Sequence, residues 1–275
     1  MRVKKNNLSL NYLFTSINQN RNLILRMIIR ELKEKYKGSV LGGLWTFLNP
    51  LLMLAVYTFV FTVVYKARWG IENPNKEYNF AIILFCGLII HTLFSEIIIR
   101  SPGVLLLNIN LVKKVIFPLE ILTLVNVGSA LVNAFFSYLI LLIAHLFLMG
   151  LPPWTFIFTP ITLLILVPLM LGFGWFVSSL GIFVRDIGQL AGLASTIMLF
   201  FSPVFYPLNS LSPKIKFLMY LNPITFPIEQ TRSVLIYGKF PDMFGIIIYF
   251  IISLIFCSIG FLWFQKSRKT FSDII

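Results

Sequence analysis

Long apolar runs alternate with short polar segments along this chain, and each run is long enough to cross a lipid bilayer as a helix. A helical crossing takes about 20 residues. Within the runs, apolar and polar residues do not alternate one by one, so the pattern indicates helices and not the strands of a β-barrel. We therefore predict an all-α integral membrane protein. Its six transmembrane helices are expected near residues 44–65, 80–100, 119–147, 155–184, 187–206 and 244–264.

These runs divide the chain into a cytoplasmic N-terminus (1–43), a six-helix transmembrane domain (44–264) and a cytoplasmic tail (265–275). Within the N-terminus, residues 21–37 have helical periodicity, with one apolar and one basic face, which is the pattern of an amphipathic helix in the membrane interface. The apolar face carries Leu25, Ile28, Ile29, Leu32 and Tyr36, and the basic face carries Arg26, Arg30, Lys33 and Lys37.

A short glycine joint, Gly38 and Gly42-Gly43, lies between this helix and the first span. Glycine permits the turn from the membrane surface into the membrane. Two interpretations of the helix remain open. It is either a membrane anchor, or an element that carries motion from a cytosolic partner into the first span.

The segment 207–243 before the last span is broken by prolines and yet mostly apolar. It is too apolar for a free loop and too interrupted for one span. Irregular backbone at membrane depth must be buried in protein or face water. The segment therefore predicts short external re-entrant helices, which either cap an exit or pack against the sixth span.

Charge sets the expected orientation of the spans. Only 12% of the residues are charged, the mean hydropathy is +0.88 and the net charge is +13. If the N-terminus is cytoplasmic, 16 of the 23 Lys and Arg residues lie on the cytoplasmic side and 7 on the other. This follows the positive-inside rule, so we expect both termini in the cytoplasm. The positive charge is a topology signal and an attraction to anionic headgroups, and we expect no nucleic-acid partner.

The sequence contains no G-x-x-x-x-G-K-[ST], H-E-x-x-H or G-x-S-x-G motif. We therefore expect a non-catalytic chain with no cofactor or metal. If it moves a substrate uphill, the energy must come from another polypeptide. Glu96 lies inside the second span. A carboxylate at that depth is costly and marks a functional candidate. It is either a polar packing contact or a group that lines or gates a path.

Four segments, in order, resemble the permease subunit of ABC exporters for lipid-linked polysaccharide of the O-antigen, capsule or teichoic-acid type, a type-2 ABC permease family. They are RELKEKYKGSVLGGLWTFLNPLL (30–52), LVKKVIFPLEI (111–121), GIFVRDIGQL (181–190) and FSPVFYPLNSLS with YLNPITFPIEQTRSVLIYG (201–212 and 220–238). The resemblance implies six spans per subunit and a homodimer with a second copy of the chain. It also implies two copies of a separate cytosolic ABC ATPase, and a location in the bacterial cytoplasmic membrane.

Three segments are the expected contacts with the ATPase. The basic face contributes Arg30, Lys33 and Lys37. The loop 101–118 is too apolar for a solvated linker, and its Lys113-Lys114 pair marks it as cytoplasmic, so it is either a short helix that fits an ATPase groove or a re-entrant loop. Arg185-Asp186 forms the turn between the fourth and fifth spans, which faces the ATPase in the family. The alternative for this turn is a local ion pair of little energetic value.

Two mixed polar and aromatic stripes are the expected lining of a substrate conduit. The first span carries Trp45, Asn49, Met53 and Tyr57, and the fifth carries Gln189, Thr196, Ser202 and Tyr206. Flat aromatic faces and hydrogen-bonding groups suit sugars, and a lining without tight sites lets a polymer slide. An exporter of a small lipid or drug remains an alternative. A membrane-embedded transferase acting on lipid-linked sugar would need clustered acidic or His residues, and these are scattered.

Overall fold

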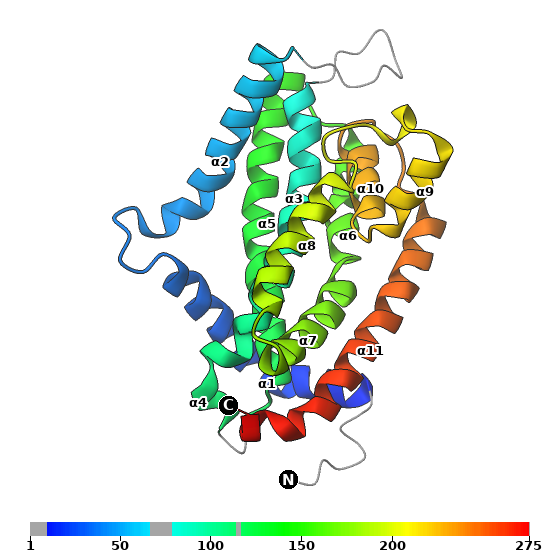
Figure 1. The fold of residues 1–275 in the computed structure, drawn as a ribbon. Coiled ribbons are helices and arrows are strands. Elements are labelled where there is room, and N and C mark those ends of the chain that lie inside the picture. The colour runs from blue at the N-terminus through cyan, green and yellow to red at the C-terminus, as the bar shows by residue number, and fades with distance from the viewer. Residues whose placement is uncertain (1–9, 67–78, 114–116, 275) are drawn as a thin grey trace.

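The computed structural model describes residues 10–66, 79–113 and 117–274, and this part of the chain contains helices and no strands (Figure 1). The all-α prediction is therefore confirmed for the described residues. In chain order the elements are α1 (Leu10–Lys35), η2 (Gly42–Leu44), α2 (Trp45–Tyr57), η3 (Thr58–Val64), α3 (Phe80–Leu107), α4 (Ile109–Val112), α5 (Glu120–Met149), η4 (Trp154–Phe158), α6 (Thr159–Leu164), α7 (Val167–Phe183), α8 (Ile187–Phe200), η5 (Leu208–Ser210), α9 (Pro213–Leu221), α10 (Thr225–Leu235) and α11 (Met243–Ile274).

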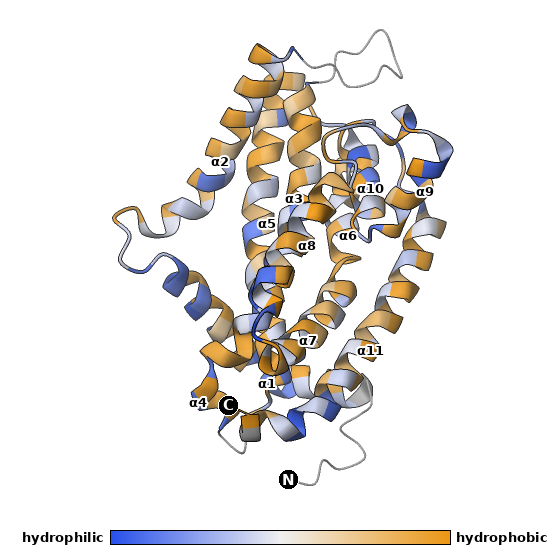
Figure 2. Ribbon diagram, in the orientation of Figure 1, coloured by the Kyte–Doolittle hydropathy of each residue, from blue (hydrophilic) through white to orange (hydrophobic). Residues whose placement is uncertain are grey.

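Five helical segments of the described chain are long and apolar enough to cross a membrane. They correspond to the first four predicted spans and to the sixth, which confirms these five by length and composition. Their apolar character runs along the whole bundle in Figure 2. The five segments are Gly42–Val64, Phe80–Leu107, Glu120–Met149, Trp154–Phe183 and Met243–Phe271.

The predicted span at 187–206 is shorter in the structure. Its helix, α8, ends at Phe200 after 14 residues, and turns follow through Tyr206. Fourteen residues of helix reach about 21 Å, against the roughly 30 Å of a bilayer's hydrocarbon core. The apolar sequence continues past Phe200, but Pro203 has no N–H to donate and disfavours helical backbone at Ser202. For this segment, the prediction of one continuous span was wrong.

The central helix of the bundle is α3, which contacts α5, α7, α8 and α10. In its most apolar stretch 83% of the residues are buried, against 6% in the span Gly42–Val64. The α3 helix begins at a polar cap, because the Asn79 side chain accepts a hydrogen bond from the Ala81 N–H at 3.0 Å. The α2 helix, in contrast, lies along one side of α3 and α5 and leaves most of its own surface uncovered.

The helices α7 and α11 pack with their backbones in contact. A Cβ added to Gly260 would lie 2.2 Å from the carbonyl oxygen of Gly172, so only glycine fits here. The α11 helix continues to Ile274 and therefore includes most of the segment 265–275 that the sequence separates as a tail. Phe271 in this segment is fully buried and packs against Phe183 and Phe264.

The N-terminal helix is longer than expected and packs through a different face. It begins at Leu10, and Leu25 and Ile29 of the predicted apolar stripe are more than half exposed. Instead, Ile24 and Met27 are buried, because α1 packs along α5. Ile28, which packs against the core, lies where a side chain on Gly128 of α5 would clash, since an added Cβ would lie 2.4 Å from Ile28 Cδ1.

Two short helices, α9 and α10, precede the last span, as the proline-rich segment predicts. They lie at the end of the bundle away from α1 (Figure 1). The α10 helix is largely buried and contacts α3, α6 and η4, whereas Met219 is the one buried residue of α9. Of the two helices, α10 is therefore packed within the bundle and α9 is exposed on its surface.

Candidate functional site

The carboxylate of Glu96 lies on α3 at a point where α1, α3 and α5 meet. Its Oε1 accepts hydrogen bonds from Lys35 Nζ at 3.3 Å and from Arg100 Nη1 at 3.1 Å. The amide nitrogen of Asn133 donates to both carboxylate oxygens at 3.2 Å. Because the Glu96 side chain is only 14% exposed, these donors replace water as its solvation.

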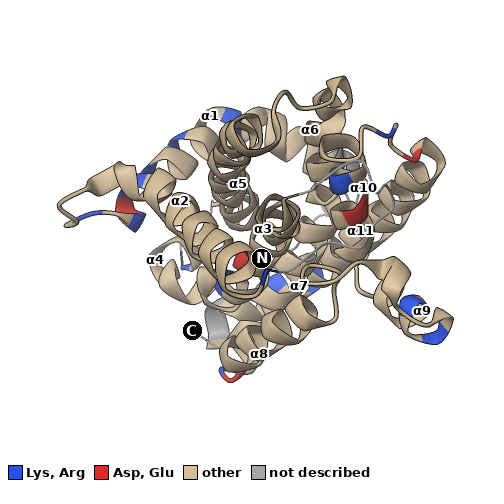
Figure 3. Cartoon of the chain, turned by 90° about the horizontal axis from the view of Figure 1, so that it is seen from above, with Lys and Arg blue, Asp and Glu red and all other residues tan. Residues whose placement is uncertain are grey.

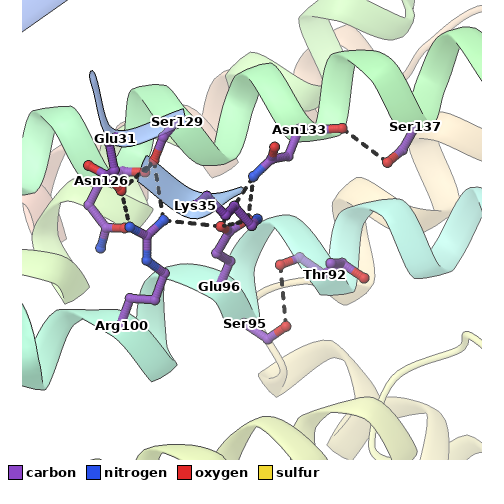
Figure 4. Close-up of polar contacts among 10 residues, drawn as sticks. All are labelled: Glu31, Lys35, Thr92, Ser95, Glu96, Arg100, Asn126, Ser129, Asn133 and Ser137. Atoms are coloured by element: carbon purple, nitrogen blue, oxygen red, sulfur yellow. Dashed lines mark hydrogen bonds and ion pairs between the residues drawn. The ribbon is translucent and has the colours of Figure 1, made fainter. Parts of the chain in front are cut away.

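Arg100 links this carboxylate to a second one. Its Nη2 forms an ion pair and hydrogen bond with Glu31 of α1, and its Nη1 lies 3.3 Å from Ser129 Oγ. The Ser129 hydroxyl donates to Glu31 Oε1 at 2.9 Å (Figure 4). We call the six side chains that these contacts connect the charge cluster: Glu31, Lys35, Glu96, Arg100, Ser129 and Asn133.

The charge cluster has a simple sequence basis. Each of its three helices contributes two polar side chains spaced by four residues, which is the spacing that puts both on one helix face. The pairs are Glu31 and Lys35 on α1, Glu96 and Arg100 on α3, and Ser129 and Asn133 on α5. The two acidic and two basic groups compensate each other, so the cluster carries no net charge at the edge of an apolar bundle.

A cavity of about 560 Å³ opens beside the charge cluster. Lys35, Glu96 and Asn133 form its polar end, and residues of α2 form one wall. Three members of the predicted stripe on the first span lie in that wall: Asn49, Met53 and Tyr57. The fourth member, Trp45, does not line the cavity. Its indole N–H donates to Ser39 Oγ at 2.8 Å, a contact that spans the glycine joint.

The predicted stripe on the fifth span lies apart from this cavity, which α8 reaches through Leu199 alone. Gln189 and Thr196 are exposed on α8, and the Thr196 hydroxyl donates to the Gly192 carbonyl at 3.1 Å. Ser202 and Tyr206 lie beyond the end of the helix, where both donate to carbonyls of α8. The two stripes therefore do not meet within one chain.

The predicted ATPase contacts occupy exposed positions at the α1 end of the bundle (Figure 1). Arg185 and Asp186 are exposed in the turn between α7 and α8, and Lys113 is exposed at the end of α4. Lys114 lies outside the described residues. The remaining members are exposed on or just after α1: Arg30, which pairs with Glu34 at 3.5 Å, Lys33 and Lys37.

A second ion pair closes the same end of the bundle and was not anticipated from the sequence. Glu120, at the start of α5, is fully buried and pairs with Arg268 of α11 at 3.0 Å. Ser16 of α1 donates to the same carboxylate at 3.1 Å, and Arg268 also donates to the Phe117 carbonyl at 2.8 Å. Burial and the nearby Glu120 charge raise the pKa of Tyr12 above its ordinary value.

Seen from above, most of the ribbon is made of residues that are neither acidic nor basic (Figure 3). Within residues 10–66, 79–113 and 117–274, no group of three or more His, Cys, Asp and Glu side chains could hold a metal ion. The two histidines lie in different helices, and His91 is occupied by a contact of its Nε2 with the Ser195 carbonyl at 3.0 Å. The fold and these sites define a multi-pass membrane protein whose polar groups connect helices.

Comparison with known proteins identifies the class further. Residues 22–236 match the family described as ABC-2 type transporter, so the chain belongs to this family and is a permease subunit of an ABC transporter. This match confirms the resemblance found in the sequence. An O-antigen export system permease protein RfbA from Myxococcus xanthus is 27% identical over 94% of this chain and 96% of its own length. Two RfbA permeases from Klebsiella pneumoniae are 26% and 27% identical, over 97% of both chains in each case.

Proposed function

We propose that this chain is the transmembrane subunit of an ATP-driven exporter that moves lipid-linked polysaccharide across the bacterial cytoplasmic membrane. It works as a homodimer with two copies of a separate cytosolic ABC ATPase, and both of its termini are cytoplasmic. The similarity to O-antigen export permeases over nearly the whole length of each chain supports the substrate class.

The observation that carries a shared conduit is the exposure of the two stripe-bearing helices. In the span that contains α2 only 6% of the most apolar stretch is buried, and in α8 the buried residues are Ala191 and Ser195. Both helices carry polar side chains on faces that one chain leaves uncovered. A second copy related by a twofold axis would bring two stripes from each subunit around a common path. The proposed lining residues are Trp45, Asn49, Met53, Tyr57, Gln189, Thr196, Ser202 and Tyr206, of which Ser202 is buried within one chain.

The charge cluster supports a route from the ATPase to this conduit. The α1 helix carries basic residues on its exposed side and Glu31 and Lys35 toward α3 and α5. A displacement of α1 would therefore act directly on Glu96, which also lines the cavity beside α2. In this proposal, the contacts that pack Glu96 against its neighbours are also the contacts through which Glu96 gates the path. The proposed ATPase contacts are Arg30, Lys33, Lys37, Lys113, Lys114, Arg185 and Asp186.

The proposal is tested with the chain expressed alone and with its ATPase. The purified chain alone should hydrolyse no ATP, and coexpression should give a complex of two copies of each subunit. In cells that lack this chain, lipid-linked polysaccharide should accumulate on the cytoplasmic side and surface polysaccharide should be lost. Normal surface polysaccharide in such cells would contradict the proposed substrate.

A further inference from the structure

The α8 helix ends at Phe200, so its last carbonyl groups have no N–H of a further helical turn from which to accept. The last carbonyls of any helix need donors from elsewhere, and unpaired backbone at membrane depth is costly. At this end of α8, the Ile197 carbonyl accepts a backbone hydrogen bond, from the Phe201 N–H at 2.9 Å. The remaining carbonyls of residues 198–201 accept hydrogen bonds from side chains.

Two of these donors follow α8 directly in the chain. The Ser202 hydroxyl donates to the Leu199 carbonyl at 2.8 Å, which is a local contact across three residues. The Tyr206 hydroxyl reaches back to the Phe200 carbonyl. The same Tyr206 hydroxyl lies 3.5 Å from Met219 Sδ of α9, a long contact to a weak acceptor, so these two donors serve α8 mainly from within its own turn.

The carbonyls of Met198 and Phe201 accept hydrogen bonds from the residue at the C-terminal end of α9. Asn222 is the residue that ends α9, and its amide nitrogen donates to Met198 O and to Phe201 O, both at 2.9 Å. Both amide protons are thereby used. One side chain thus fastens the end of α8 to the junction between α9 and α10.

The turn after α8 is fixed a second time by a fully buried arginine of α10. Arg232 donates to the carbonyls of Pro203 and Val204, the latter at 2.9 Å, and to Ile83 O of α3 at 3.2 Å. Gly87 makes room for the guanidinium, because a Cβ there would lie 2.8 Å from Arg232 Nη2. These contacts tie the turn to the central helix of the bundle.

The two attachments differ in strength and burial. Arg232 makes charged contacts to several segments and is closed off from solvent. Asn222 is partly exposed, makes neutral contacts and lies beside α9, whose surface is mostly uncovered. If the outer end of α8 moves, Asn222 is the attachment that opens.

We propose that Asn222 is a positioning residue that latches the outer end of the conduit. Its amide holds the end of α8 in the closed position and releases Met198 O and Phe201 O when substrate passes, while Arg232 keeps the turn in place. The released carbonyls then accept hydrogen bonds from the hydroxyl groups of the polymer or from the water that enters with it. This inference rests on the proposed function, because it requires α8 to line the conduit.

The first test measures leakage in the absence of nucleotide. The complex with its ATPase is reconstituted into liposomes, and the influx of a small neutral sugar is followed. Asn222→Ala removes both donors, so the permeability should rise about tenfold, the shift that two hydrogen bonds of modest net strength produce in an equilibrium. Asn209→Ala is the matched control, because it removes an exposed amide of the same external segment whose side-chain oxygen accepts from Lys216. Wild-type permeability in the Asn222 variant, with or without a lower thermal midpoint, would overturn the latch.

The second test locks the contact and keeps the fold. Phe201→Cys and Asn222→Cys are combined in a chain in which Cys86 and Cys257 are replaced by Ala, and the two new thiols are joined by oxidation or a short bifunctional reagent. Cross-linked complexes should hydrolyse ATP but export no polysaccharide, and reductant should restore export after oxidation. Export at the uncross-linked rate would overturn the latch. Failure of the proposed function is a different result, because the wild-type complex would then export no polysaccharide.

Discussion

Glu31 of α1 and Arg100 of α3 are 69 positions apart in the chain and form an ion pair. The same arginine holds Glu96, so a helix that lies outside the transmembrane bundle is joined by charge to its central helix. The pair is shielded by α5, whose Ser129 bonds to both partners. A purely peripheral anchor would not need such an attachment.

Replacing Arg100, the cation that Glu31 and Glu96 share, should therefore weaken the attachment of α1 to the bundle. Arg100→Gln leaves two carboxylates without their common partner, and we expect a loss of about 1–3 kcal/mol, less than for fully buried pairs because the arginine side chain is 35% exposed. Thermal unfolding of the detergent-purified protein measures the change. Arg30→Gln is the control, because the pair of Arg30 with Glu34 is exposed and should be worth at most about 0.5 kcal/mol. Equal losses in the two variants would show that the cluster carries no special stability.

The glycine joint should be sensitive at one position and tolerant at the next. Gly42 has φ +49°, whereas Gly43 has no such restriction, and a Cβ on either would meet no atom within 4 Å. Gly42→Ala thus strains the backbone by about 1 kcal/mol and stiffens the joint, and Gly43→Ala does neither to the same degree. We expect Gly42→Ala to assemble with the ATPase but to export less polysaccharide per ATP hydrolysed. If both variants export as wild type at equal expression, α1 serves only as an anchor.

The orientation of the chain can be tested by thiol labelling in intact cells. Asn209 and Lys113 are exposed at opposite ends of the bundle, and the native Cys86 and Cys257 are buried. In a chain that lacks both native cysteines, Asn209→Cys should react with an impermeant maleimide. Lys113→Cys should react only after the membrane is opened. The opposite labelling pattern would reverse the proposed topology.

The close approach of α7 and α11 should not accept a methyl group. In Gly260→Ala the new Cβ would lie 2.2 Å from a backbone oxygen, which cannot rotate away as a side chain can. We expect a loss of about 1–3 kcal/mol or failure to accumulate in the membrane. Gly103→Ala on α3 is the control, since its nearest neighbour would be the Leu107 side chain at 3.7 Å. Similar stability of the two variants would mean that the helices can separate without cost.

The spans were predictable because length and hydrophobicity are local properties of the sequence. The end of α8 was missed, because the chain stays apolar past Phe200 and Pro203 was the one local signal of a break. The contacts that hold this end, from Asn222 to α8 and from Arg232 to the turn after it, are not connected to α8 by any periodicity. In the candidate site, Glu96 was predictable as an intramembrane charge. Its partners were not singled out, although pairs such as Glu31 and Lys35 recur at helical spacing on each of the three helices.

The ion pair between Glu120 and Arg268 also constrains the order in which this protein can mature. Arg268 is made 148 residues after Glu120, whereas Ser16, the other partner of that carboxylate, is made 104 residues before it. The nascent chain therefore holds the Glu120 carboxylate without this cationic partner until Arg268 has left the ribosome. Chains truncated before Arg268 would leave the buried Glu120 carboxylate without its cationic partner, and they should be less stable than chains that contain it.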